Sequence, residues 1–347
     1  MTVRPMLARP LALLLALPLA CLGPPPVRAG SEHAGSDRSI QAVHGLTLAR
    51  VQSRGTVRCG SVERPGIAER DGAGQWRGLA VDVCRAVAAA ALGKAERFEY
   101  HTYEPQSGYE RVQARADDLY FLTGREFVEG KLIGALVPGP TVFIASDAVM
   151  VPADSPLEHV AELAGKGVCF MIADTAEQAL GHYFGKADLA WLRHPYSEHG
   201  EMQDAYAAGR CQAIAAESTE LARIRTLPGQ ARLRSRILPE LLNVFPLVAA
   251  TSTADGQWSA IVAWTVHTLI DAERPESDWF AGGARAMPIP AANLGLSADW
   301  QARVLKATGH FGDIYARNLG AGSVYQLERG LNSNQLEGGL QLSPFVE

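Results

Sequence analysis

Residues 76–103 read WRGLAVDVCRAVAAAALGKAERFEYHTY, and this stretch decides the fold class. Its apolar residues recur at helical spacing and stop at Gly93, as in a helix that buries one face. The spacing is carried by Cys84, Val87, Ala88, Ala91 and Leu92. Residues 98–103 are typical of a β-strand. The stretch therefore predicts a helix that ends near Gly93, with a strand directly after it.

Strands and helices alternate along most of the remaining chain. In the first half we expect helices at residues 46–51 and 108–114 and strands at 56–59 and 118–122. The pattern restarts with an extended run at 142–151, which Pro152 ends. Beyond it we expect helices at 157–163, 176–184 and around 202–206, and strands at 168–172 and 211–216. Two such arrays predict an α/β protein of two lobes, each a mostly parallel sheet flanked by helices, with a ligand cleft at the carboxyl ends of the strands.

The last quarter of the chain differs from this pattern. One amphipathic helix is indicated by Trp258, Ile261, Val262, Thr265 and Leu269. A second is indicated by Trp300, Val304, Ala307 and Phe311. Because no strands accompany them, we expect extra C-terminal helices that pack around the first lobe.

Composition excludes several classes of function. The 347 residues carry a formal net charge of −5 and are 47% hydrophobic, which fits a soluble globular protein of two domains. No run rich in lysine and arginine occurs, so we expect no nucleic-acid partner. No cysteine pair has zinc-ligand spacing and no histidine cluster lies nearby, so we expect neither a metal nor another cofactor.

Residues 1–29 are predicted to be a signal peptide. Arg4 and Arg9 precede the apolar stretch 11–22, which is too short to span a membrane. The small residues around Val27-Arg28-Ala29 suit a cleavage site. Export of the chain is therefore expected.

The N-terminal region allows a second export hypothesis, and a lead-in segment follows the predicted signal peptide. Residues 30–44 are non-periodic and predict a flexible lead-in. Lipid attachment at Cys21 would anchor the protein to a membrane. Pro18 lies where lipoprotein signals prefer a branched apolar residue, which disfavours that alternative.

Four cysteines remain after the signal segment: Cys59, Cys84, Cys169 and Cys211. An even number in an exported protein predicts two disulfides, for which three connectivities exist. The alternative, buried free thiols, is disfavoured by the export signal.

Several motifs occur in the order found in one known family. They are Arg58-Cys59-Gly60, Trp76 and Gly78, residues 81–90, residues 205–211 (AYAAGRC), Gln257-Trp258 with Trp264, Phe311-Gly312, Arg317-Asn318, Gly330-Leu331-Asn332 and Gly338-Gly339-Leu340. By these motifs the chain resembles the periplasmic general L-amino-acid-binding proteins of ABC importers, the family-3 solute-binding proteins. The resemblance covers nearly everything after residue 45.

The resemblance implies a type II periplasmic-binding-protein fold, in which two lobes joined by two crossing segments close on a ligand. Residues 45–149 and 250–347 would form the first lobe and residues 150–249 the second, with crossings near 148–152 and 245–250. One disulfide would lie in each lobe, Cys59 with Cys84 and Cys169 with Cys211. The resemblance also implies a monomer in the periplasm whose partners are a small ligand and a membrane ABC permease.

The family holds an α-amino acid with three groups: an arginine after a strand, a Thr-Gly-Thr-Thr turn and an aspartate of the second lobe. Arginine suits a carboxylate because its planar fork forms two parallel hydrogen bonds. An ungapped match places Leu122 at the arginine, residues 173–176 (ADTA) at the turn and Glu217 at the aspartate. Losing the arginine should weaken α-amino-acid binding, since a charge-assisted hydrogen bond contributes about 1.5–3 kcal/mol.

Two alternatives would preserve a ligand site. Arg125 lies three residues after Leu122 and could take the carboxylate, although a solvated loop arginine is the simpler interpretation. Otherwise Asp174, Thr175 and Glu217 would form an acidic cleft suited to an amine, although Asp174 also suits a helix N-cap. Tyr120 could wall such a pocket, although aromatic residues in strands are more often core.

These observations support a binding protein rather than an enzyme. Our leading hypothesis is a substrate-binding component that captures an amino acid or amine for an ABC transporter. A second hypothesis is a transport-independent accessory or sensory subunit with a degenerate ligand site. A third, a dehydratase using Glu217 or Asp174, has no supporting motif.

Overall fold

The computed structural model describes residues 45–104, 110–273 and 289–344. The predicted signal peptide, the lead-in and Cys21 lie outside these residues. Three parallel strands form the sheet of the first lobe in the order β4-β1-β5. These are β1 (Val57–Val62), β4 (Phe98–Tyr103) and β5 (Leu119–Thr123). The first lobe also contains α1 (Leu46–Arg54), α2 (Leu79–Leu92), α3 (Glu110–Gln113), α4 (Gly124–Glu129) and the hairpin of β2 (Glu69–Arg70) and β3 (Trp76–Arg77).

Helix α2 is the buried central helix of the first lobe. Its alanine-rich sequence leaves small side chains, which let neighbouring elements approach its axis. Gly78 precedes it with φ 129°, and a Cβ there would lie 2.2 Å from the carbonyl oxygen of Ile67. Gly93 ends it in the left-handed conformation, φ 70°, as the sequence predicts. Residues 76–103 therefore contain the predicted helix and the predicted strand.

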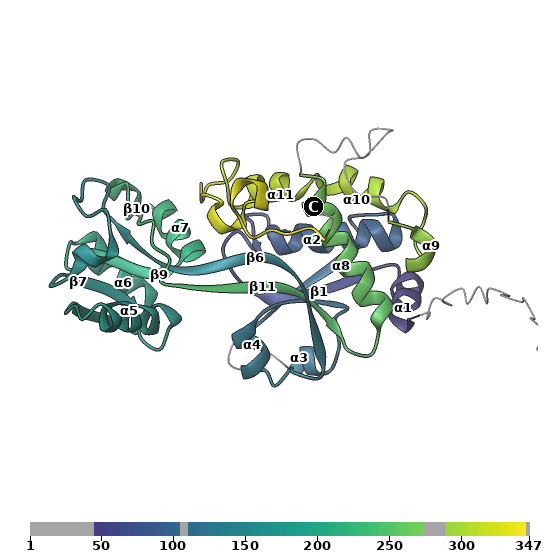
Figure 1. The fold of residues 1–347 in the computed structure, drawn as a ribbon, viewed down its shortest axis with the longest axis horizontal. Helices are drawn as coiled ribbons and strands as arrows, with labels where there is room; N and C mark the ends of the chain where they lie inside the picture. Colours follow the sequence, from purple (N-terminus) through teal and green to yellow (C-terminus); the bar gives the residue numbers. More distant parts are fainter. Residues whose placement is uncertain (1–44, 105–109, 274–288, 345–347) are drawn as a thin grey trace, which may run out of the picture. The chain divides into compact units, whose positions relative to one another are not determined.

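Two long antiparallel strands connect the lobes. They are β6 (Leu136–Val151) and β11 (Asn243–Ser252). Strand β11 pairs with β5 of the first lobe, and β6 pairs with β9 of the second (Figure 1). Both lobes therefore share one hydrogen-bonded path of strands, β4-β1-β5-β11-β6-β9-β7-β8.

The second lobe repeats the parallel arrangement. Its strands β9, β7 and β8 are parallel, and helices cover them. These elements are β7 (Gly167–Met171), α5 (Thr175–Lys186), β8 (Leu192–Tyr196), α6 (His199–Ala207), β9 (Ala213–Glu217) and α7 (Ser218–Thr226), with the short β10 (Arg236–Ile237) on β6. The predicted helix at 157–163 is a 3-10 turn over Val160–Leu163. The fold is thus the predicted two-lobed α/β architecture.

The C-terminal helices pack on the first lobe. Trp258, Trp300 and Phe311 are fully buried in the same apolar cluster as α2 and β1. The elements are α8 (Gly256–Asp271), α9 (Ala291–Leu294), α10 (Trp300–Thr308) and α11 (Phe311–Asn318). The single helix expected to run from Trp300 to Phe311 is wrong, because Gly309 adopts φ 71° and His310 caps a new helix.

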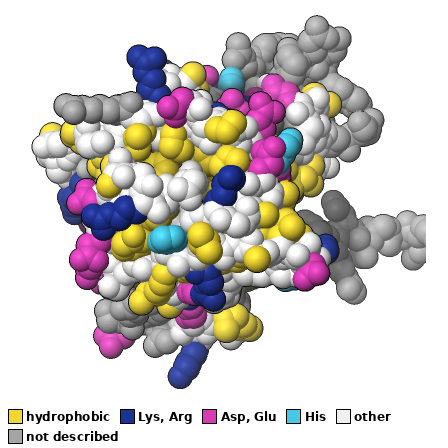
Figure 2. Space-filling view, turned by 90° about the vertical axis from the view of Figure 1, so that its left-hand side faces the viewer, with side chains coloured by type: hydrophobic (Ala, Val, Ile, Leu, Met, Phe, Trp, Pro, Cys, Tyr) yellow, Lys and Arg dark blue, Asp and Glu magenta, His cyan; other side chains and the backbone are white. Residues whose placement is uncertain are grey.

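Disulfides cross-link each lobe, Cys59 of β1 to Cys84 of α2 and Cys169 of β7 to Cys211. These are the pairs that the family resemblance implies. In the described ranges, no helix is long and apolar enough to cross a membrane, and no three potential metal ligands cluster. Figure 2 faces the second lobe and shows acidic, basic and apolar side chains interspersed over it.

Candidate functional site

A cleft of about 900 Å³ lies where the carboxyl ends of strands from both lobes approach one another. The first lobe contributes Val62 at the end of β1, Thr123 at the end of β5, and α4. The second lobe contributes the turn after β7, the start of α5, and Glu217 at the end of β9. Ligands of open α/β sheets bind outside the carboxyl ends of the strands, so this cleft is the first candidate for a ligand site.

Carboxylates outnumber cations in the cleft lining. Its acidic side chains are Glu126, Glu129, Asp174 and Glu217, and its arginines are Arg64 and Arg125. Four carboxylates against two guanidinium groups leave a formal charge of −2 when His199 is neutral. The cleft therefore attracts cations more than anions.

Glu217 is the second-lobe carboxylate that the family match singles out. Its Oε1 accepts a hydrogen bond from the Thr219 hydroxyl at 2.9 Å, and its Oε2 lies 3.7 Å from Arg64 Nε. Burial raises the pKa of Glu217, and the nearby Arg64 partly opposes that rise. A ligand cation beside Glu217 would stabilise its ionised form.

Beneath the cleft, Asp147 of β6 is a fully buried carboxyl group. Its partners on the neighbouring strands are Glu217 of β9 and Asn243 of β11. The Thr175 hydroxyl donates to Asp147 Oδ1 at 2.9 Å. Burial, together with the nearby Asp174 and Glu217, raises the pKa of Asp147 to about 6. The sequence analysis did not single out Asp147. The only sequence feature that marks it is that it is the one acidic residue in the mostly apolar run 142–151.

The turn before α5 places Asp174 and Thr175 at the cleft. Asp174 is the N-cap, and its Oδ1 accepts a hydrogen bond from the Thr175 backbone at 2.6 Å, so the capping role holds. The left-handed residue of the turn is Ala173, with φ 60°, whereas Asp174 has φ −87°. Glycine suits the left-handed position. Ala173, rather than Asp174, therefore takes the backbone conformation that glycine adopts most easily.

Three further residues discussed from the sequence lie at or near β5. Arg125 lines the cleft, is half exposed and pairs with Glu129 one turn along α4. Leu122 is fully buried in an apolar cluster of the first lobe. Tyr120 belongs to the same cluster, accepts a hydrogen bond from the Asp117 backbone at 3.1 Å, and is not among the described residues that line the cleft.

Arg64 is the cleft residue that sequence reasoning missed. It follows β1, and its side chain is 15% exposed. Its Nη2 donates to Glu126 Oε1 at 3.0 Å, in addition to the contact with Glu217. Its signal in the sequence was a charged residue just after a strand end, next to Pro65-Gly66.

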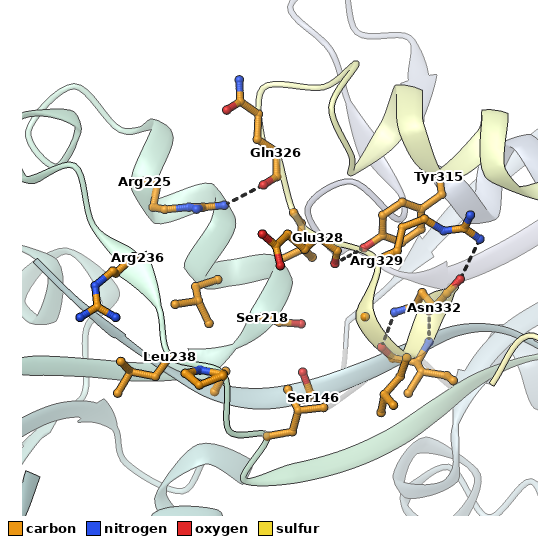
Figure 3. Close-up of a pocket in the computed structure, with 18 residues that line it drawn as sticks. Ser146, Ser218, Arg225, Arg236, Leu238, Tyr315, Gln326, Glu328, Arg329 and Asn332 are labelled. Carbon is orange, nitrogen blue, oxygen red and sulfur yellow. Dashed lines mark hydrogen bonds between the residues drawn. The ribbon is translucent and has the colours of Figure 1, made fainter. Parts of the chain in front are cut away.

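A second cavity of about 490 Å³ lies on the opposite face of β6, lined by Ser146 and Ala148 rather than Asp147 (Figure 3). Its arginines are already bonded to protein groups. Arg225 donates to the carbonyl oxygen of Tyr325 at 2.7 Å, and Arg329 donates to that of Asn332 at 2.9 Å (the latter drawn in Figure 3). This cavity is the weaker candidate.

Comparison with known proteins gives relatives that cover both lobes. No protein-family model matches the chain. The chain is 30% identical over 323 residues to the general L-amino acid-binding periplasmic protein AapJ of Rhizobium johnstonii, covering 88% of this chain and 94% of the relative. It is 28% identical over 324 residues to the glutamate/glutamine/aspartate/asparagine-binding protein BztA of Rhodobacter capsulatus, covering 87% and 94%. A solved ABC transporter/periplasmic binding protein from Brucella ovis, with glutathione bound, has a TM-score of 0.70 and 26% identity, covering 86% and 99%.

Proposed function

Because the chain belongs to the family of periplasmic amino-acid-binding proteins of ABC transporters, we propose that its acidic cleft captures a ligand by the ligand's cationic amino group. The chain is an extracytoplasmic substrate-binding protein that holds an amino acid or amine between its lobes in the periplasm. Its protein partner is the membrane part of an ABC transporter. The observation that carries the proposal is the excess of carboxylates in the cleft lining.

Glu217 and Asp174 are the proposed partners of the amino group. Both line the cleft, and burial raises the pKa of Glu217, so a bound ammonium group would offset the cost of ionising this carboxyl group. Thr175 and Arg125 supply further polar contacts from the same lining. We assign Tyr120, a residue of β5, an indirect role in the apolar cluster that it shares with Leu122.

Binding between lobes follows from this distribution of groups. A ligand that contacts both lobes favours the arrangement in which all its contacts are made, since it binds that arrangement more tightly. Our assignment of lobe boundaries, residues 45–149 with 250–347 and residues 150–249, stays a prediction. The relatives are binding proteins, and we propose the same of this chain, with its cleft carboxylates used for binding rather than catalysis.

The test is a thermal-shift screen of the mature protein against the twenty amino acids, polyamines and small carboxylates. A ligand at 100 times its dissociation constant should stabilise the fold by about 2.7 kcal/mol. Glu217→Gln should weaken binding of any hit by about tenfold or more, since one charge-assisted hydrogen bond is lost. Glu96→Gln, at an exposed first-lobe residue outside the cleft lining, is the matched control. Stabilisation by carboxylates alone, or by no compound, would refute the proposal and favour an accessory subunit.

A further inference from the structure

Helix α7 belongs to the second lobe but also touches the first. Its Leu221 and Ile224 are buried in an apolar cluster of the second lobe. Ala222, on another face of the helix, is fully buried in the first-lobe cluster that contains Tyr325. Arg225 follows Ala222 by three residues and therefore lies on the same face. One face of α7 is thus anchored in its own lobe, while another meets the opposite lobe.

Arg225 makes a polar contact between the two lobes. Its Nη2 donates to the carbonyl oxygen of Tyr325 at 2.7 Å and to that of Gln326 at 3.4 Å, and Figure 3 draws the second of these bonds. The first lobe holds these acceptors in place, because the Tyr325 ring is buried in its cluster and the Tyr325 hydroxyl donates to Glu69. We call Arg225 with its two carbonyl acceptors the Arg225 latch.

The Arg225 latch lies on the face of the connecting strands that is opposite the ligand cleft. Successive residues of a strand point to opposite faces. On β6, Asp147 lies beneath the cleft, where it bonds with Thr175 at the start of α5. Its neighbours Ser146 and Ala148 instead line the second cavity, together with Arg225. That cavity of about 490 Å³ has walls from both lobes.

This placement sets what the latch does when the lobes move. Strands β6 and β11 connect the lobes, so a rotation of the lobes about these strands narrows one face while it widens the other. A ligand that draws the lobes together across the cleft therefore moves α7 away from Tyr325 and Gln326. The hydrogen bonds of Arg225 to these two carbonyl oxygens are then lost.

From this geometry we infer that the Arg225 latch holds the cleft open and thereby lowers the affinity of the protein for its ligand. The inference rests on the proposed function, since a ligand must close the lobes. The apparent dissociation constant rises in proportion as the binding-competent arrangement becomes rarer. One hydrogen bond from a charged group is strong enough to change that population about tenfold. Arg225 thus sets ligand affinity from outside the ligand cleft.

The experiment compares Arg225→Met with Arg236→Met. Arg236 lines the same cavity and also donates to backbone carbonyl oxygens, but its acceptors, Ser155 and Leu157, lie in its own lobe. Calorimetric titration measures dissociation constants for the twenty L-amino acids, putrescine and spermidine. For the compound that the wild type binds best, Arg225→Met should tighten binding about tenfold, and Arg236→Met should change it less than about twofold.

A measurement without ligand separates the latch from the proposed function. Val128 of α4 and Lys186 of α5 are exposed residues of the two lobes, and neither is among the described residues that line the cleft. Fluorophores attached at Val128→Cys and Lys186→Cys report the separation of the lobes by single-molecule energy transfer. The closed population of the ligand-free protein should rise about tenfold in Arg225→Met and stay unchanged in Arg236→Met.

Arg225→Lys guards against a variant that does not fold, because lysine keeps the charge and much of the apolar stem. Lysine lacks the planar fork of arginine, so this variant should tighten binding by only about two- to fivefold. Weaker binding in either Arg225 variant, or an equal gain in Arg236→Met, would overturn the latch. If no compound binds the wild type, the proposed function fails. The energy-transfer populations then still decide on the latch, and no rise in either folded Arg225 variant would overturn it.

Discussion

Replacing Asp147 with asparagine should stabilise the protein at neutral pH. The carboxyl group is fully buried, and its pKa is raised from an ordinary value of 3.8 to about 6. Each unit of pKa difference between the folded and unfolded states corresponds to about 1.4 kcal/mol, so ionised Asp147 costs the fold about 3 kcal/mol at pH 7. Asparagine removes that cost.

Part of the gain is offset by lost hydrogen bonding. The asparagine oxygen can still accept from the Thr175 hydroxyl, now 2.9 Å from Asp147 Oδ1. Its amide nitrogen would face the Asn243 amide, which lies 3.5 Å from Oδ2, and this loss costs about 1 kcal/mol. The expected net gain for Asp147→Asn at pH 7 is therefore about 2 kcal/mol in the free energy of unfolding.

The pH dependence of the stability difference shows whether ionisation of Asp147 causes the gain. Between pH 4 and pH 6 the folded state holds the Asp147 proton while the unfolded state has released it, so wild-type stability falls as pH rises through this window. The variant lacks this contribution, and its advantage should grow from pH 4 to pH 6 and then level off.

Urea unfolding at pH 4, 5, 6 and 7.5 measures this difference, with Asp154→Asn at an exposed aspartate as the control for a change of charge. An advantage that is constant with pH, or largest at pH 4, would refute the reasoning.

Three further changes test the fold. Leu122→Arg, suggested by the family match, should instead destabilise the protein by about 3 kcal/mol or more, because it places a guanidinium group in an apolar cluster; an unchanged urea midpoint would show that this position opens to the cleft. The Cys59→Ala/Cys84→Ala variant should lose about 3.5 kcal/mol in the free energy of unfolding, because the bridge joins residues 25 apart in sequence. Chemical unfolding under non-reducing conditions measures this loss, and a clearly smaller value would contradict the expectation. Asp82→Ala should cost about 2–3 kcal/mol, because Asp82 of α2 accepts 2.7 Å hydrogen bonds from Arg317 and Asn318 of α11; calorimetry showing no loss would mean that α11 does not depend on them.

The sequence predicted the architecture because its signals are local. Helical spacing up to Gly93 and the strand at residues 98–103 depend only on neighbouring residues, and both appear in the structure. The disulfide pairs needed the family resemblance, since four cysteines allow three connectivities. Periodicity could not find the break between α10 and α11, because Trp300, Val304 and Phe311 keep helical spacing across Gly309.

The cleft was only partly predictable because its contacts join distant parts of the chain. Arg64 meets Glu126, 62 residues later, and no local pattern reports that approach. All five residues of β5 are buried, so an alternation of polar and apolar residues could not show which face of the sheet Tyr120 occupies. Asp174 and Glu217 were found from the family match and do line the cleft. Their role in binding stays a prediction.

The path of β6 and β11 sets the order in which the chain can fold. The strands of the second lobe, β9, β7 and β8, and their partner β6 all lie between residues 136 and 217. The first core needs Trp258 and Trp300 beside residues near Val57, so it must wait for the last third of the chain. Contacts between such distant residues form slowly, because a long loop must close first. As the polypeptide emerges N-terminus first, the second lobe can therefore finish folding before the first. A chain that stops after β11 would lack α8, α10 and α11, the helices that pack on α2.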